Sequence, residues 1–126
     1  MTSMGLRIPL LLAALAIAFA LPSRAAAASL SGEYTCLTYG ASINWFQNLV
    51  FWPNGHYALG TTQKPYGQGQ YTLDSRHIVH FLSGGDDKFL GLLQNGNIYL
   101  KFKTDNGPFI KRGFDLTFKC GRNSRQ

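Results

Sequence analysis

Two cysteines, Cys36 and Cys120, set the strongest limit on the topology of this 126-residue chain. They lie near the two ends of the sequence that follows an apolar N-terminal segment. In an exported protein such a pair forms a disulfide rather than a metal site or a nucleophile. The bond would close a loop of 85 residues, which the loop-entropy model values at about 4 to 5 kcal/mol. We therefore expect the first and last strands of the domain to lie side by side.

The first 28 residues have the order of a secretory signal peptide. Arg7 gives a short basic start, and residues 10–21 form an almost purely apolar run. This run has the length of a signal-peptide core and is too short to span a bilayer. Residues 25–28 are all alanine and offer several cleavage sites, the last of which releases a chain beginning at Ser29. We expect removal of residues 1–28 and a secreted or periplasmic protein with no stable membrane anchor; a retained N-terminal anchor or a core helix is the alternative.

The expected mature chain, residues 29–126, has the size of one domain. It carries ten basic and six acidic residues, so its formal net charge is +4, against +6 for the whole chain. Nucleic acid is not an expected partner, because this positive balance is small and the compartment is wrong. We expect a monomer.

Glycines and turn dipeptides cut the mature chain into short segments rich in aromatic and β-branched residues. This pattern is typical of β-strands. Residues 53–55, 83–85 and 95–96 have hairpin-turn composition, because Gly and Asn tolerate the positive φ angles of tight turns. Eight strands are predicted, near residues 33–37, 48–52, 56–61, 70–73, 77–82, 88–93, 97–103 and 113–120.

Short connections between these segments favour antiparallel neighbours, and the disulfide brings the first and last of them together. The sequence therefore predicts an all-β fold, a small antiparallel up-and-down β-barrel of about eight strands. A β-sandwich with the same disulfide is the alternative. Residues 42–50 fit a strand least well, because their apolar spacing also suits one or two helical turns.

The end of the chain shows the clearest alternation of apolar and polar residues. Phe114, Leu116, Phe118 and Cys120 fall on one face of a strand, with polar residues between them. A period of two is typical of a strand with one buried face. We expect these four side chains in the core.

The tripeptide Gly-x-Tyr occurs three times and ends at Tyr34, Tyr57 and Tyr71. Each copy falls where a strand leaves a turn. We expect each tyrosine to fill the barrel rim with its hydroxyl in water; the alternative is that the three surround a ligand.

Sixteen aromatic side chains remain in the mature chain, and they suggest a first functional hypothesis. A barrel of about eight strands is either filled by its own side chains or holds one small ligand. Trp45, Trp52 and Tyr57 are the candidate lining of a site, in the interior or at the mouth, for a small apolar or amphipathic molecule. The loops at residues 61–68 and 104–111 are candidates for a mouth or a partner surface.

Basic residues near the C-terminus suggest a second hypothesis, a surface-interaction protein. Lys101, Lys103 and Lys119 are predicted to share the outer face of one hairpin. Such a patch attracts lipid headgroups, acidic glycans or an acidic partner protein. An inhibitor of a secreted enzyme or an envelope-anion binder would fit; a plain solvated strand face is the alternative.

The sequence contains few residue patterns that are typical of catalysis or metal binding. His77 and His80 are three residues apart, which puts them on opposite faces of a strand. Asp86 and Asp87 lack the ligand spacing of a calcium loop and are expected at a solvated hairpin tip. No Gly-x-Ser-x-Gly motif occurs, and the disulfide leaves no free cysteine. We predict no enzyme, no metal and no cofactor.

In size, disulfide and strand number the expected domain resembles small exported barrels, such as lipocalin-like binders and periplasmic lysozyme inhibitors. The triplet Tyr34-Thr35-Cys36 is similar to one in the lysozyme inhibitors, but their serine-glycine-tyrosine signature is not found here at its expected spacing. The resemblance implies a barrel architecture, which does not by itself determine a function.

Overall fold

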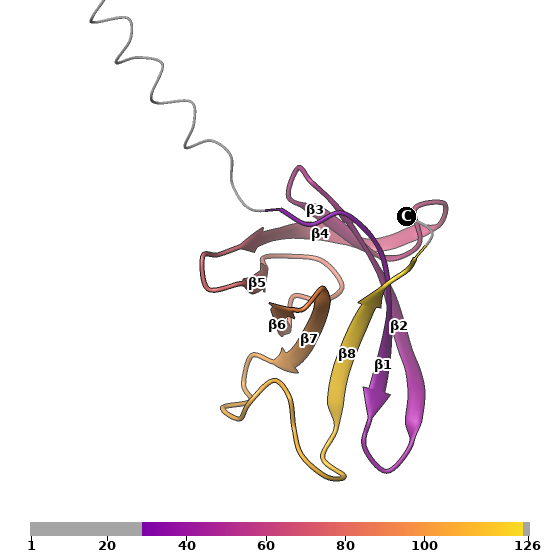
Figure 1. The fold of residues 1–126 in the computed structure, drawn as a ribbon. Helices are drawn as coiled ribbons and strands as arrows, with labels where there is room; N and C mark the ends of the chain where they lie inside the picture. The colour runs from indigo at the N-terminus through magenta and orange to yellow at the C-terminus, as the bar shows by residue number, and fades with distance from the viewer. Residues whose placement is uncertain (1–28, 125–126) are drawn as a thin grey trace, which may run out of the picture.

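A computed structural model describes residues 29–124 as a closed antiparallel barrel of eight strands, with no helix in that range (Figure 1). Each strand pairs with its neighbours in sequence, and the last pairs with the first. The barrel prediction is confirmed, whereas the predicted signal peptide, residues 1–28, lies outside the described residues. The strands are β1 (Gly32–Tyr39), β2 (Ile43–Trp52), β3 (His56–Gly60), β4 (Pro65–Leu73), β5 (Ile78–Phe81), β6 (Phe89–Gln94), β7 (Asn97–Phe102) and β8 (Thr117–Arg122).

Several strands begin or end at other residues than predicted. Residues 42–50 do not form helical turns, because β2 begins at Ile43 and pairs with both β1 and β3. β4 begins at Pro65, so the predicted loop at residues 61–68 is shorter. β8 begins only at Thr117. The predicted strand residues 113–116 therefore lie outside β8.

The disulfide joins β1 to β8 at the seam where the barrel closes. Cys36 and Cys120 face each other across the ladder, and both side chains are fully buried. The predicted pairing is confirmed. Because such bonds persist where thiols are not kept reduced, the disulfide indicates a protein of an oxidising compartment.

Side chains fill the barrel interior. Phe51 of β2 lies among four other rings, with centroids 5.5 Å away for Tyr34, 6.2 Å for Tyr57, 5.1 Å for Tyr71 and 6.2 Å for Phe81. All five rings are at most 4% exposed. The interior is therefore a packed core, which answers whether the barrel is filled or hollow. The aliphatic and aromatic residues packed around these rings include Leu30, Leu49, Val79, Phe89, Ile98 and Leu100.

The β3–β4 turn folds back over the outside of the barrel. The amide and hydroxyl of Thr62 donate hydrogen bonds to Glu33 Oε2, over 2.9 and 2.7 Å, so the turn reaches across β2 to the start of β1. Gly60 makes this reversal possible, because its φ of 88° suits glycine and a Cβ there would lie 2.5 Å from the Lys64 carbonyl oxygen. The turn therefore covers the outward side of β2 beside Glu33.

Candidate binding surfaces

The structure does not bring together the three aromatic residues predicted to line a ligand site. Tyr57 is fully buried in the interior. Trp52 is the next residue after the inward-facing Phe51 and therefore points outward, where its ring stacks on His56 with centroids 5.1 Å apart. Trp45 is 62% exposed. Simple alternation with Phe51 would turn Trp45 inward, but the register shift between Gln47 and Trp45 in the β1–β2 ladder interrupts it, so neither tryptophan faces the interior.

The three Gly-x-Tyr tyrosines are interior residues, each at most 4% exposed, and the prediction that the hydroxyl reaches water is wrong for Tyr57 and Tyr71. The Tyr57 hydroxyl donates to the Ser83 carbonyl over 2.6 Å and accepts from the Asp86 amide over 2.9 Å. Burial raises the pKa of Tyr57 to about 12. The Tyr71 hydroxyl accepts from the amide of Leu30 over 2.8 Å. Both hydroxyls fasten a chain segment to the barrel.

Asp86, predicted at a solvated hairpin tip, is 1% exposed. The Gln47 side-chain amide donates to Asp86 Oδ2 over 2.6 Å. Burial raises the pKa of this carboxyl to about 6. Its neighbour Asp87 is exposed, as predicted. A carboxyl that titrates near neutrality is common at catalytic sites, but here its bonds anchor the β5–β6 loop in the end of the barrel.

The two histidines considered as a metal pair lie in different settings. His80 Nε2 in β5 is 2.9 Å from Asp74 Oδ2, and this hydrogen bond, followed by one from the Ile78 amide, lowers the pKa of Asp74 to about 2. His77 is exposed in the preceding turn with a φ of 67°. Between residues 29 and 124, no three His, Cys, Asp or Glu side chains are placed to hold a metal ion.

Lys101, Lys103 and Lys119, the predicted basic surface, each have a different local contact. Lys101 and Lys119 lie on the neighbouring strands β7 and β8, and Lys103 lies just beyond β7. Their partners are the Gly107 carbonyl for Lys101 (2.6 Å), the Phe81 carbonyl for Lys103 (3.2 Å) and the Tyr39 ring for Lys119 (5.7 Å to its centroid).

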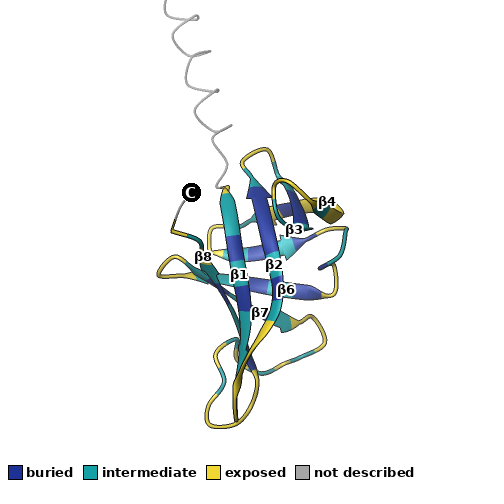
Figure 2. Ribbon diagram, turned by 90° about the vertical axis from the view of Figure 1, so that its right-hand side faces the viewer, coloured by how far each residue is buried: buried dark blue, intermediate teal, exposed yellow. Residues whose placement is uncertain are grey.

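An exposed apolar surface lies where the β1–β2 hairpin meets the β7–β8 loop. We call its four side chains the apolar tip; they are Ile43, Trp45, Phe114 and Leu116, exposed by 64, 62, 82 and 52%. The two segments touch, because a Cβ on Gly40 would lie 3.1 Å from Leu116 Cδ2. Figure 1 shows both segments projecting at the same end of the barrel, and Figure 2 shows β2 changing from buried to exposed towards it.

The prediction that Phe114 and Leu116 are core residues is therefore wrong. Both precede β8, so no ladder fixes their orientation. Phe118 is partly buried against the core, and Cys120 is fully buried, as predicted. Thr117, expected on the polar face, is 7% exposed and accepts a hydrogen bond from the Lys111 amide.

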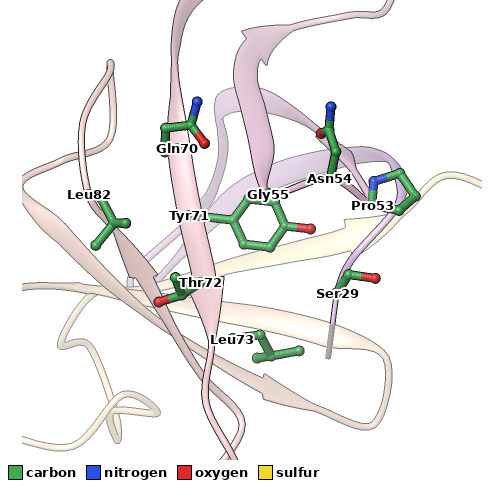
Figure 3. A pocket seen from close by; sticks show the side chains of 9 residues that line it. All are labelled: Ser29, Pro53, Asn54, Gly55, Gln70, Tyr71, Thr72, Leu73 and Leu82. Carbon is green, nitrogen blue, oxygen red and sulfur yellow. The ribbon is translucent and has the colours of Figure 1, made fainter. Parts of the chain in front are cut away.

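A cleft of about 390 Å³ lies where the β2–β3 turn meets the end of β4 (Figure 3). Its surface is mostly apolar, with contributions from Pro53, Tyr71, Leu73 and Leu82. Clefts of roughly 300 to 1,000 Å³ are typical of small-molecule sites. Sequence reasoning missed this cleft, and only the turn at residues 53–55 gave a signal near it. Polar residues that also line it are Ser29, Asn54, Gln70 and Thr72.

Comparison with known proteins found no matching family model, no matching curated protein and no matching solved structure. Among the residues that the structure describes, no helix is long and apolar enough to cross a membrane.

Proposed function

We propose that this protein is an exported binding protein that holds a small apolar or amphipathic molecule in the cleft beside the β2–β3 turn. The observation that carries the proposal is the volume and lining of that cleft, about 390 Å³ with mostly apolar walls. The filled interior leaves no room around Tyr57, so the ligand binds at the end of the barrel rather than inside it.

The wall of the cleft is pre-formed. The Tyr71 hydroxyl accepts from the Leu30 amide and lies 3.0 and 2.9 Å from the carbonyl oxygens of Leu30 and Trp52. These contacts tie the N-terminal segment and the end of β2 to β4. A site that is already ordered costs less entropy when a ligand binds.

Polar groups at the cleft favour an amphipathic ligand over a pure hydrocarbon. Gln70 and Thr72 are exposed in β4 and bring an amide and a hydroxyl to the apolar walls. Cleavage before Ser29 would add a free α-amino group, which is mostly protonated at neutral pH because its pKa is about 8. An apolar body with one anionic or hydrogen-bonding end fits this combination.

The test is titration of the mature chain, residues 29–126, with the amphipathic anion 8-anilinonaphthalene-1-sulfonate. We expect saturable fluorescence enhancement with one site per chain. Thr72→Trp should fill the cleft and lower the affinity at least tenfold, while the matched control Gln94→Trp, on exposed β6 surface, should leave it unchanged. The double variant Trp45→Ser/Phe114→Ser reports on binding to the apolar tip. If this variant removes the signal and Thr72→Trp does not, the cleft is not the site.

Native mass spectrometry identifies the natural ligand class. Protein purified from the exported fraction of its own host should carry a small adduct that Thr72→Trp protein lacks. An adduct that is equally abundant on both proteins would place the ligand elsewhere.

A further inference from the structure

The exposed apolar side chains of this barrel are concentrated and not scattered. Of the eight large apolar side chains exposed within residues 29–124, six lie in the β1–β2 hairpin or between residues 102 and 116. Single exposed apolar residues are normal on soluble proteins, but a contiguous group marks an interaction site. The apolar tip is the most exposed part of this group, because Phe114 alone is 82% exposed.

The chain segment that carries Phe114 and Leu116 has an excess of basic residues. Residues 101–119 contain five lysines and arginines but only two aspartates. One of the two, Asp105, is already neutralised, because its carboxylate lies 2.6 Å from the Lys111 ammonium. Arg112 is exposed directly before the tip, opposite in charge to exposed Asp115. The tip is therefore presented by a segment with net positive charge.

We infer that the apolar tip docks the protein on an anionic lipid bilayer. The β1–β2 hairpin and the β7–β8 loop project from the barrel (Figure 1), so their side chains can enter the boundary between headgroups and acyl chains. Tryptophan is enriched at that depth of membranes, and Trp45 belongs to the tip. Basic residues beside the tip are attracted by the negative surface potential of anionic lipids.

The shape of the tip favours a bilayer over a protein partner. A stable protein interface usually buries about 800 Å² on each partner, which needs a broad complementary surface. The four side chains of the tip offer a smaller surface than such an interface needs. A bilayer needs no complementary shape, because lipids can contact an inserted projection on every side. Binding of this kind combines buried apolar area with electrostatic attraction. The inference is independent of the proposed ligand cleft, because the cleft and the tip share no residue.

The test is cosedimentation of the mature chain with two kinds of phosphatidylcholine vesicle. One kind contains about 40 mol% of the anionic lipid phosphatidylglycerol, and the other contains none. We expect binding to the anionic vesicles that is at least tenfold stronger than binding to pure phosphatidylcholine and that weakens at high salt. Trp45→Ser/Phe114→Ser should weaken it at least tenfold. The matched control is Tyr66→Ser, which removes an exposed aromatic side chain (57% exposed) outside both the tip and the cleft and should bind normally.

Tryptophan fluorescence gives a second readout. Emission should shift to the blue on anionic vesicles, and the shift should persist in Trp52→Phe but disappear in Trp45→Phe. Equal binding to both kinds of vesicle, or equal loss of binding in Trp45→Ser/Phe114→Ser and in Tyr66→Ser, overturns the inference. So does an absence of vesicle binding with self-association that Trp45→Ser/Phe114→Ser abolishes, because the tip would then join two copies of the chain.

Discussion

Two groups of large apolar side chains in this barrel have similar chemistry and opposite environments. The rings around Phe51 are at most 4% exposed, whereas the side chains of the apolar tip are 52 to 82% exposed. The first group lies on the inward faces of β1 to β5. The second lies at the start of β2, which pairs there only with β1, and in the chain before β8. Position in the barrel, and not residue type, separates core from surface here.

This comparison shows where an alternating pattern stops being informative. Leu116 and Phe118 have the same parity, yet only Phe118 packs against the core. The ladder between β7 and β8 ends at Phe118, so nothing forces Leu116 to turn inward. An apolar pattern that continues past the end of a strand therefore identifies residues available for binding.

The largest expected effect comes from truncating one ring in each group. Phe51→Ala should lower the free energy of unfolding by about 4 kcal/mol, because it removes the ring at the centre of a packed cluster. Phe114→Ala should change it by less than about 0.5 kcal/mol, as is usual for exposed positions. Urea unfolding of the oxidised mature chain measures both. A cost above about 2 kcal/mol for Phe114→Ala would mean that the tip is packed in solution.

Asp86 gives the second prediction, a dependence of interior stability on pH. Its folded pKa of about 6 lies above the ordinary value of 3.8 for an aspartate, so the folded state holds a proton that the unfolded state releases. Stability from this group is therefore full at low pH and is lost as the pH rises through about 6. The two values correspond to about 3 kcal/mol in total, of which roughly half falls between pH 5 and 7.5.

Urea unfolding at several pH values, compared with Asp86→Asn, isolates this contribution. The asparagine does not titrate, so the difference in unfolding free energy between the two proteins should shift steadily in favour of Asp86→Asn as the pH rises. Parallel curves for the parent protein and Asp86→Asn would show that the carboxyl titrates alike in both states.

The fold was predictable from the sequence because its determinants are local. Glycine and asparagine turns delimit short β segments, and Cys36 and Cys120 join the ends, so a closed meander follows. The predicted strand at residues 113–120 was too long because the composition of a segment does not reveal where its partner strand ends. In the structure the ladder between β7 and β8 stops at the pair Leu100 and Phe118.

The candidate sites were less predictable because they depend on contacts between distant segments. Burial of Asp86 requires its loop to enter the barrel, which Gly84 allows, since a Cβ there would lie 2.8 Å from the Tyr57 hydroxyl. The pair Gly84-Gly85 was visible in the sequence as a turn, but its partner was not. The cleft likewise combines residues 29, 53–55, 70–73 and 82, which no local motif connects.

The smallest expected effect concerns a single hydroxyl that fastens the N-terminal segment to the interior. Tyr71→Phe keeps the ring but leaves the buried Leu30 amide without its acceptor, so the free energy of unfolding should fall by about 1 to 2 kcal/mol. Tyr66→Phe, at a residue 57% exposed, is the matched control and should be neutral. Hydrogen exchange at the Leu30 amide should accelerate only in Tyr71→Phe. Unchanged exchange would mean that packing of the Leu30 side chain, which is 6% exposed, holds the segment without the hydroxyl.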